Sequence, residues 1–151
     1  MEKVATQRIC IDTDVIIDYL RETPVYGDVL SWVLEEYECF VSPVTTYELY
    51  YGGFYSGEME GVRDVLSSLT SLHWDDKSSE EAARIHVHLI KQGLDIGVKD
   101  ILTAGNCLSS NLSLLTRNVN HFLRVPGLNV ISVEDIVKNR EEVNSELESE
   151  D

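Results

Sequence analysis

The sequence is poor in cysteine and proline, with only three of each among its 151 residues. Cys10, Cys39 and Cys107 show none of the paired spacing that is typical of zinc sites. No apolar run approaches the roughly 20 residues that a membrane-spanning helix needs. The first residues also lack the apolar segment of a signal peptide, so a cytoplasmic location is the default expectation.

Basic residues are scarce as well, since 12 lysines and arginines accompany 27 aspartates and glutamates, for a net charge of −15. Residues 141–151 hold six acids and no base, and without them the charge is still −9 (12 bases minus 21 acids). Such a chain is poorly suited to bind nucleic acid by charge over its whole surface. A metal-assisted site with a local basic patch remains compatible with this composition.

The chain does have the length and composition of one globular domain, with 43% hydrophobic residues. Short apolar runs of strand type alternate with segments at helical spacing from residue 8 to about residue 139. This alternation predicts an α/β fold with a mainly parallel central sheet covered by helices on both faces. We expect one domain over residues 1–140, followed over 141–151 by an acidic tail that is disordered or orders on a partner.

Two helix ends follow from local sequence. Gly52 and Gly53 are expected to interrupt the helix that begins near Thr45, because glycine is a poor helix former. Apolar periodicity is lost after Lys138, which predicts that the last helix ends at about residue 139.

The stretch from Arg8 to Asp18 organises the prediction of a functional site. Residues 8–11 are typical of a short buried strand, and a helical pattern begins after Asp12. Ligands of open α/β sheets bind at the carboxyl ends of strands, so Asp12 is well placed to hold a metal or to attack a phosphate. The alternative is that Asp12 or Thr13 only caps the first helix.

Four polar residues are predicted to meet at one edge of the sheet. Asp12 and Asn118 each come just after an apolar strand, and Glu48 and Asp100 lie early on helices that could begin at the same edge. Clustered carboxylates repel one another unless a cation is present. Oxygen ligands suit Mg²⁺ or Mn²⁺, which can activate water for attack at phosphorus.

Each of these residues also has a purely structural interpretation. Glu48 could be a solvated helix residue, and Asp100 could serve the dipole of its own helix. Asn118 and Thr116 could be ordinary turn residues. The set of four, and not any single member, favours a site.

Four segments in this order resemble the PIN-domain family, and most closely its VapC-type ribonuclease toxins from toxin–antitoxin pairs. Those segments are Ile11-Asp12-Thr13-Asp14-Val15-Ile16-Ile17-Asp18, Ser42-Pro43-Val44-Thr45-Thr46-Tyr47-Glu48-Leu49-Tyr50-Tyr51-Gly52, Ile96-Gly97-Val98-Lys99-Asp100-Ile101-Leu102-Thr103-Ala104 and Leu115-Thr116-Arg117-Asn118-Val119-Asn120-His121-Phe122. The resemblance runs from about residue 8 to residue 137.

The resemblance implies a metal-dependent endoribonuclease in which Asp12, Glu48 and Asp100 are the metal-binding acids. Asn118 falls where the family often has a fourth Asp or an Asn, and Thr116 would hydrogen-bond within the site. This chain departs from the family at two positions. His121 stands where a further acid is common, and Asp14 where many members have Asn; these departures bear on the presence of a second metal ion.

The resemblance also implies a homodimer and a small antitoxin partner that inserts a segment into the acidic cleft. Aromatic residues that would suit a partner groove or dimer face, or else pack in the core, are Tyr47, Tyr50, Tyr51, Phe54 and Tyr55. Lys99, Arg117 and Arg124 are candidates for phosphate contacts, with the alternative that they only balance nearby acids.

Two other classes of protein remain as alternatives. A non-catalytic PIN-fold module would bind a partner or RNA, and Asn118 and His121 leave this open. A haloacid-dehalogenase-type phosphatase would use Asp12 as its nucleophile. Against it, Lys99 and Asp100 precede Thr116, which reverses that family's order, and no late pair of acids in a Gly-Asp-x-x-x-Asp pattern occurs.

Overall fold

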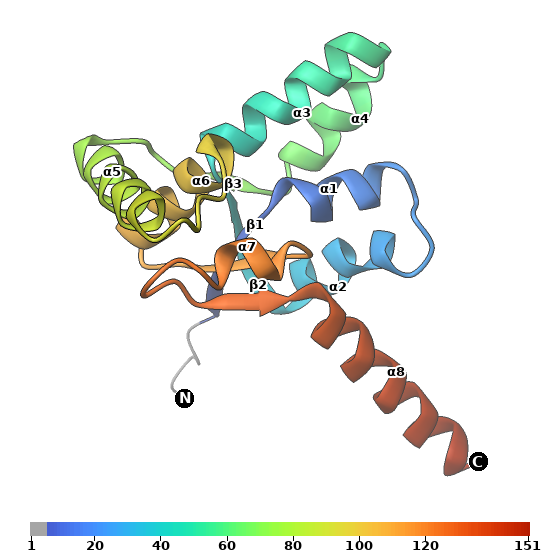
Figure 1. Ribbon diagram of the computed structural model, residues 1–151. Coiled ribbons are helices and arrows are strands. Elements are labelled where there is room, and N and C mark those ends of the chain that lie inside the picture. The colour runs from blue at the N-terminus through green and yellow to red at the C-terminus, as the bar shows by residue number, and fades with distance from the viewer. Residues whose placement is uncertain (1–5) are drawn as a thin grey trace, which may run out of the picture.

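Five parallel strands form a single sheet in the order β3-β2-β1-β4-β5 (Figure 1). The computed structural model describes residues 6–151, so residues 1–5 of the predicted domain lie outside the described residues. The strands are β1 (Gln7–Ile11), β2 (Tyr37–Val41), β3 (Thr70–Ser71), β4 (Ser113–Thr116) and β5 (Val130–Ser132). The predicted α/β fold with a parallel central sheet is confirmed.

Helices cover both faces of this sheet. The first face is covered by α1 (Thr13–Leu20), α2 (Val29–Glu36), α3 (Pro43–Ser56), α4 (Met59–Leu66) and α8 (Val133–Ser149), and a short 3₁₀ turn, η1 (Tyr26–Asp28), precedes α2. The second face is covered by α5 (Asp76–Lys91), α6 (Val98–Ser109) and α7 (Val119–Phe122).

Successive residues of the strands supply the two separate cores. Ile9 and Ile11 of β1 join the cluster on the first face, whereas Cys10 between them joins the cluster on the second. Leu115 and Leu114 of β4 divide in the same way. This follows from the two-residue period of a strand, in which neighbouring side chains point to opposite faces. Both faces are therefore apolar, as in other buried parallel sheets.

The order in which the strands are added to the sheet reverses at β1. From β1 the chain proceeds to β2 and β3 on one side, and then crosses to β4 and β5 on the other side. Beyond their carboxyl ends β1 and β4 are still joined, because the Asp12 amide donates to the Leu115 carbonyl at 2.9 Å. Such a switch point is where open α/β sheets bind ligands.

The predicted interruption of the third helix at Gly52 and Gly53 is wrong, since α3 continues to Ser56. Gly53 instead allows α4 to approach closely, because a β-carbon there would lie 3.1 Å from the side chains of Met59 and Val62. The helix ends at Gly57, whose φ of +80° is the left-handed conformation that glycine adopts readily.

The last helix extends beyond its predicted end at about residue 139. Helix α8 continues from Val133 to Ser149 and extends away from the body of the molecule (Figure 1). The side chains of residues 141–151 are all exposed, so no tertiary packing holds this part of the helix. Its glutamates favour helix, and the segment contains neither glycine nor proline. Within residues 6–151, no helix is long and apolar enough to cross a membrane.

Candidate active site

Asp12 lies at the junction of β1 and α1, with only 8% of its surface exposed. One carboxylate oxygen, Oδ1, accepts a hydrogen bond from the Thr13 amide at 2.8 Å, so Asp12 does cap α1. The other, Oδ2, accepts from the Thr116 hydroxyl at the end of β4, at 2.7 Å. The two interpretations of Asp12, as a cap and as a site residue, are therefore compatible, because its second oxygen faces the switch point.

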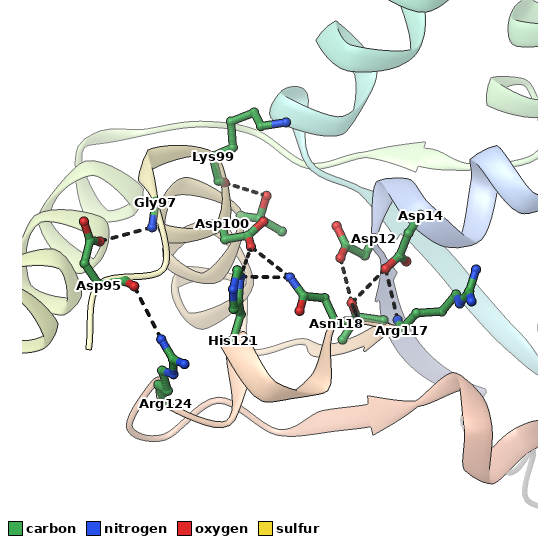
Figure 2. A network of polar contacts seen from close by, with 12 residues as sticks. Asp12, Asp14, Asp95, Gly97, Lys99, Asp100, Arg117, Asn118, His121 and Arg124 are labelled. Carbon is green, nitrogen blue, oxygen red and sulfur yellow. Dashed lines mark hydrogen bonds and ion pairs between the residues drawn. The ribbon is translucent and has the colours of Figure 1, made fainter. Parts of the chain in front are cut away.

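Asp14 lies beside Asp12 and also contacts the residues that follow β4. Its Oδ2 accepts from the Arg117 backbone amide at 3.2 Å, and the Thr116 hydroxyl lies 3.4 Å away (Figure 2). Its other oxygen, Oδ1, is buried and has no hydrogen-bond partner. A buried acceptor without a donor is costly, so this oxygen marks a place where a cation or a donor would be stabilising.

Burial raises the pKa values of both carboxyl groups, and repulsion by Asp14 adds to the rise for Asp12. The pKa of Asp12 rises from 3.8 to about 7, first because of desolvation and then because of the negative charge of Asp14, with a smaller contribution from Asp100. The hydrogen bond from Thr116 opposes this rise. Desolvation also raises the pKa of Asp14. At neutral pH, Asp12 therefore lies near the midpoint between its protonated and its charged form.

Glu48 reaches the same edge of the sheet from the second turn of α3. The Thr13 hydroxyl donates to Glu48 Oε1 at 3.0 Å, and it lies 2.9 Å from the buried Thr45 hydroxyl. Glu48 Oε2 accepts from the Lys99 ammonium at 2.8 Å. This hydrogen bond is the main reason that the pKa of Lys99 is raised, so Lys99 remains charged beside the site.

Asp100, in the first turn of α6, is held by two residues that follow β4. His121 Nδ1 lies 2.8 Å from Asp100 Oδ2, and the Asn118 side-chain amide donates to the same oxygen at 3.3 Å. His121 and Asn118 also contact each other at 2.8 Å, which closes a three-residue network (Figure 2). All these contacts use Oδ2, so the network leaves Asp100 Oδ1 available to other groups.

The residues present fit a divalent cation by their chemistry. Within residues 6–151, no three His, Cys, Asp or Glu side chains are already arranged as a metal site. The donors nevertheless are carboxylate oxygens, which Mg²⁺ and Mn²⁺ prefer. The repulsion felt by Asp12 and the unpartnered oxygen of Asp14 are both features that a bound cation would relieve.

Sequence reasoning missed two residues that position the predicted ones. Thr13 and Thr45 were not predicted as site residues, yet they lie against each other and Thr13 holds Glu48. Both are buried hydroxyls within the first turns of helices that follow strands. That placement beside the predicted acids was the available signal.

Arg117, considered above for a phosphate contact, is instead bound to the protein. Its guanidinium lies 2.9 Å from the buried Asp18 carboxylate and 4.0 Å from the centre of the Tyr26 ring. These contacts favour the alternative that Arg117 balances a nearby acid. Arg124 contacts only the Asp95 carbonyl among its hydrogen-bond partners in the described residues, at 3.4 Å.

Comparison with known proteins identifies the family. The sequence model of the PIN domain matches residues 9–128, and the chain belongs to this family. Ribonuclease VapC2 of Haemophilus influenzae is 33% identical over 123 residues, which cover 78% of this chain and 92% of the relative. Ribonuclease VapC3 of Methanocaldococcus jannaschii is 38% identical over 94 residues, covering 62% of this chain and 92% of the relative.

A solved structure agrees with these relatives. VapBC-1 from nontypeable Haemophilus influenzae matches with a TM-score of 0.73 and 25% identity, over 85% of this chain and 99% of that one. The resemblance to VapC-type proteins that the four sequence segments predicted is thereby confirmed. The phosphatase alternative loses its basis, because it depended on a different family assignment for the Asp12 stretch.

Proposed function

We propose that this chain is a metal-dependent endoribonuclease that cleaves RNA phosphodiester bonds, and that it is the toxin of a type II toxin–antitoxin pair. The observation that carries the proposal is the buried Asp12, whose pKa is raised to about 7 at the switch point of a PIN fold. Relatives named as VapC ribonucleases, which this chain covers over most of their length, support the activity.

Asp12, Glu48 and Asp100 are the residues that we propose to hold the metal ion, with Asp14 contributing its unpartnered oxygen. VapC nucleases of the PIN family are generally dependent on a divalent metal, and we propose Mg²⁺ or Mn²⁺ for this chain. When bound, such an ion supplies an activated water and stabilises charge that develops at phosphorus.

The remaining site residues orient these acids. The Thr116 hydroxyl donates to Asp12, and its oxygen accepts from the backbone amide of Asn118 at 2.9 Å. This second hydrogen bond fixes the direction of the donation to Asp12. Asn118 and His121 orient Asp100, and Thr13 orients Glu48. Residues that hold ligands in this way are needed for affinity and activity in metal sites generally.

The proposed partners are an antitoxin protein and a second copy of this chain. The solved relative is a VapBC pair. The aromatic residues Tyr51, Phe54 and Tyr55 of α3 are more than half exposed, which is unusual for so many large rings on one helix. Exposure of this kind supports the interpretation as an interaction face over that of core packing.

The decisive experiment is cleavage of a mixed structured RNA pool with Mg²⁺, with Mn²⁺ and with chelator. Wild type is compared with Asp100→Asn, and with Asp135→Asn as the control, since Asp135 is an exposed acid in the first turn of another helix. We expect metal-dependent cleavage that is lost in Asp100→Asn and retained in Asp135→Asn. Absence of cleavage by folded, inhibitor-free wild type with either metal would favour a non-catalytic binding module.

A further inference from the structure

A cavity of about 370 Å³ lies directly beside the acidic site. Its lining residues come from the start of α3, from the segment before α5 and from α6; they are Pro43, Val44, Tyr47, Trp74, Lys99 and Leu102. All of them are apolar or aromatic except Lys99. The same Lys99 contacts Glu48 at 2.8 Å, so the cavity and the candidate site share one side chain.

The two aromatic walls differ in how firmly they are held. Trp74 is half-buried, packs against the core cluster of the second sheet face, and donates its indole N–H to Ser79 Oγ at 2.9 Å. Tyr47 is 66% exposed, and its ring lies 6.4 Å, between ring centres, from that of Tyr51 one helical turn further along α3. The Trp74 wall is therefore fixed, and the Tyr47 wall is an accessible ring on a rigid helix.

Lys99 places a positive charge between this cavity and the carboxylates. Its side chain is 68% exposed, and it extends from α6 toward the start of α3 (Figure 2). A cation at the rim of an aromatic cavity is the arrangement that fits a nucleotide, with the base among the rings and the phosphate at the ammonium. The rest of the surface is acidic, so little of the affinity for RNA can come from long-range charge attraction.

We propose that this cavity binds an unpaired base of the RNA substrate, stacked on Tyr47 and Trp74, with an adjacent phosphate at Lys99. The inference rests on the proposed nuclease function and adds to it a single-stranded substrate segment. Base stacking on aromatic rings tolerates every base, because each has a π-face. The subsite therefore positions the chain for cleavage, and it favours loops or ends over paired RNA.

The test uses wild type in chelator and a set of single-stranded decaribonucleotides, each with 2-aminopurine at one position. Stacking quenches the fluorescence of this base, so we expect quenching at a restricted position in wild type and its loss in Tyr47→Ala. With metal present, Tyr47→Ala should raise KM about 10-fold with a smaller change in kcat. Tyr47→Phe should restore both signals, because the ring is retained.

The matched control is Tyr19→Ala, which removes an exposed tyrosine of α1 that neither lines this cavity nor belongs to the aromatic face of α3. Unchanged quenching and KM in folded Tyr47→Ala would overturn the subsite. Loss of binding to a protein partner with unaltered RNA parameters would overturn it too, and would assign the cavity to that partner. If wild type shows Tyr47-dependent quenching but cleaves nothing, the nuclease proposal fails while the base site stands.

Discussion

Near the ends of β1 and β4, the buried Asp12 lies beside the half-buried Asp14, whereas Glu48 on α3 contacts Lys99 and Asp100 on α6 contacts His121. The first pair has hydroxyl and amide donors but no cation, and its pKa values are raised. The second pair is held by Lys99 and His121. One half of the site is thus destabilised by its own charge, and the acids of the other half are held by hydrogen bonds from nearby side chains.

This difference indicates which half of the site a bound cation would stabilise more. Repulsion between buried acids costs free energy in the folded protein, and a cation recovers it on binding. Exposed or half-exposed ion pairs such as Lys99 with Glu48 contribute little to stability. We therefore expect metal and pH to affect the β1–β4 half much more than the half formed by α3 and α6.

The largest effect is expected for Asp12→Asn, which removes the charge at the centre of the buried half. Cleavage should fall by about 100-fold or more, because a proposed metal ligand is lost. At pH 8 in chelator, the free energy of unfolding should instead rise by up to about 4 kcal/mol, because a buried, repelled carboxylate becomes neutral. Urea unfolding and RNA cleavage measure the two quantities. Full activity in the variant would show that Asp12 only caps α1.

The second prediction concerns pH in the absence of metal. Since the pKa of Asp12 is 3.8 in the reference state and about 7 in the folded protein, the folded state binds more protons between these values. Stability must then decrease as the pH rises from about 4 to about 7, by up to about 1.4 kcal/mol per pH unit from this group.

Urea unfolding at several pH values in chelator tests this, with Asp12→Asn as the reference that lacks the group. The wild type should lose stability relative to the variant as the pH rises, and 10 mM Mg²⁺, on the order of a saturating concentration, should reduce the loss. A difference that grows in the opposite direction would show that Asp12 is not repelled in the folded protein.

A smaller effect is expected for Arg117→Ala. The substitution leaves the Asp18 carboxylate buried without its partner and removes the ring contact with Tyr26. We expect a loss of about 1–2 kcal/mol in the free energy of unfolding. KM for RNA should stay within about twofold of wild type if Arg117 makes no phosphate contact. A large rise in KM for RNA at unchanged stability would show instead that Arg117 contacts the RNA.

The smallest effect on stability is expected for Lys99→Met, which keeps the length of the side chain and removes its charge. The change in unfolding free energy should be within about 0.5 kcal/mol, because this ion pair is largely exposed. KM for RNA should rise about threefold to tenfold through the lost phosphate contact. Lys99 and Arg117 would then be separated clearly, one as a substrate contact and the other as a structural residue.

The positions of the main site residues could be predicted from local sequence patterns, because these patterns are the same in every fold of this class. An apolar run followed by a helical period placed Asp12 at a strand end, and the alternation of strands and helices predicted the parallel sheet. Since parallel strands end at a common edge, Asn118 and Asp12 were expected to be neighbours. Their roles as ligands remain proposals.

Three features could not be predicted from the local sequence patterns. Gly53 marks a close approach of α4, and neither a break nor a close contact can be distinguished from a Gly-Gly pair alone. The direction of Arg117 toward Asp18 requires a contact across 99 positions. Helix α8 continues past the end predicted at about residue 139, because loss of apolar periodicity ends the packed face of a helix and not the helix itself.

By itself, the sequence determined the fold class and the edge at which the polar residues gather, because strand and helix periodicity are local properties. Only the tertiary structure decided which carboxylates are buried without a cation and which are paired with Lys99 or His121. Burial and pairing depend on distances between elements that are far apart in the chain, and these distances set the electrostatic energy of the site.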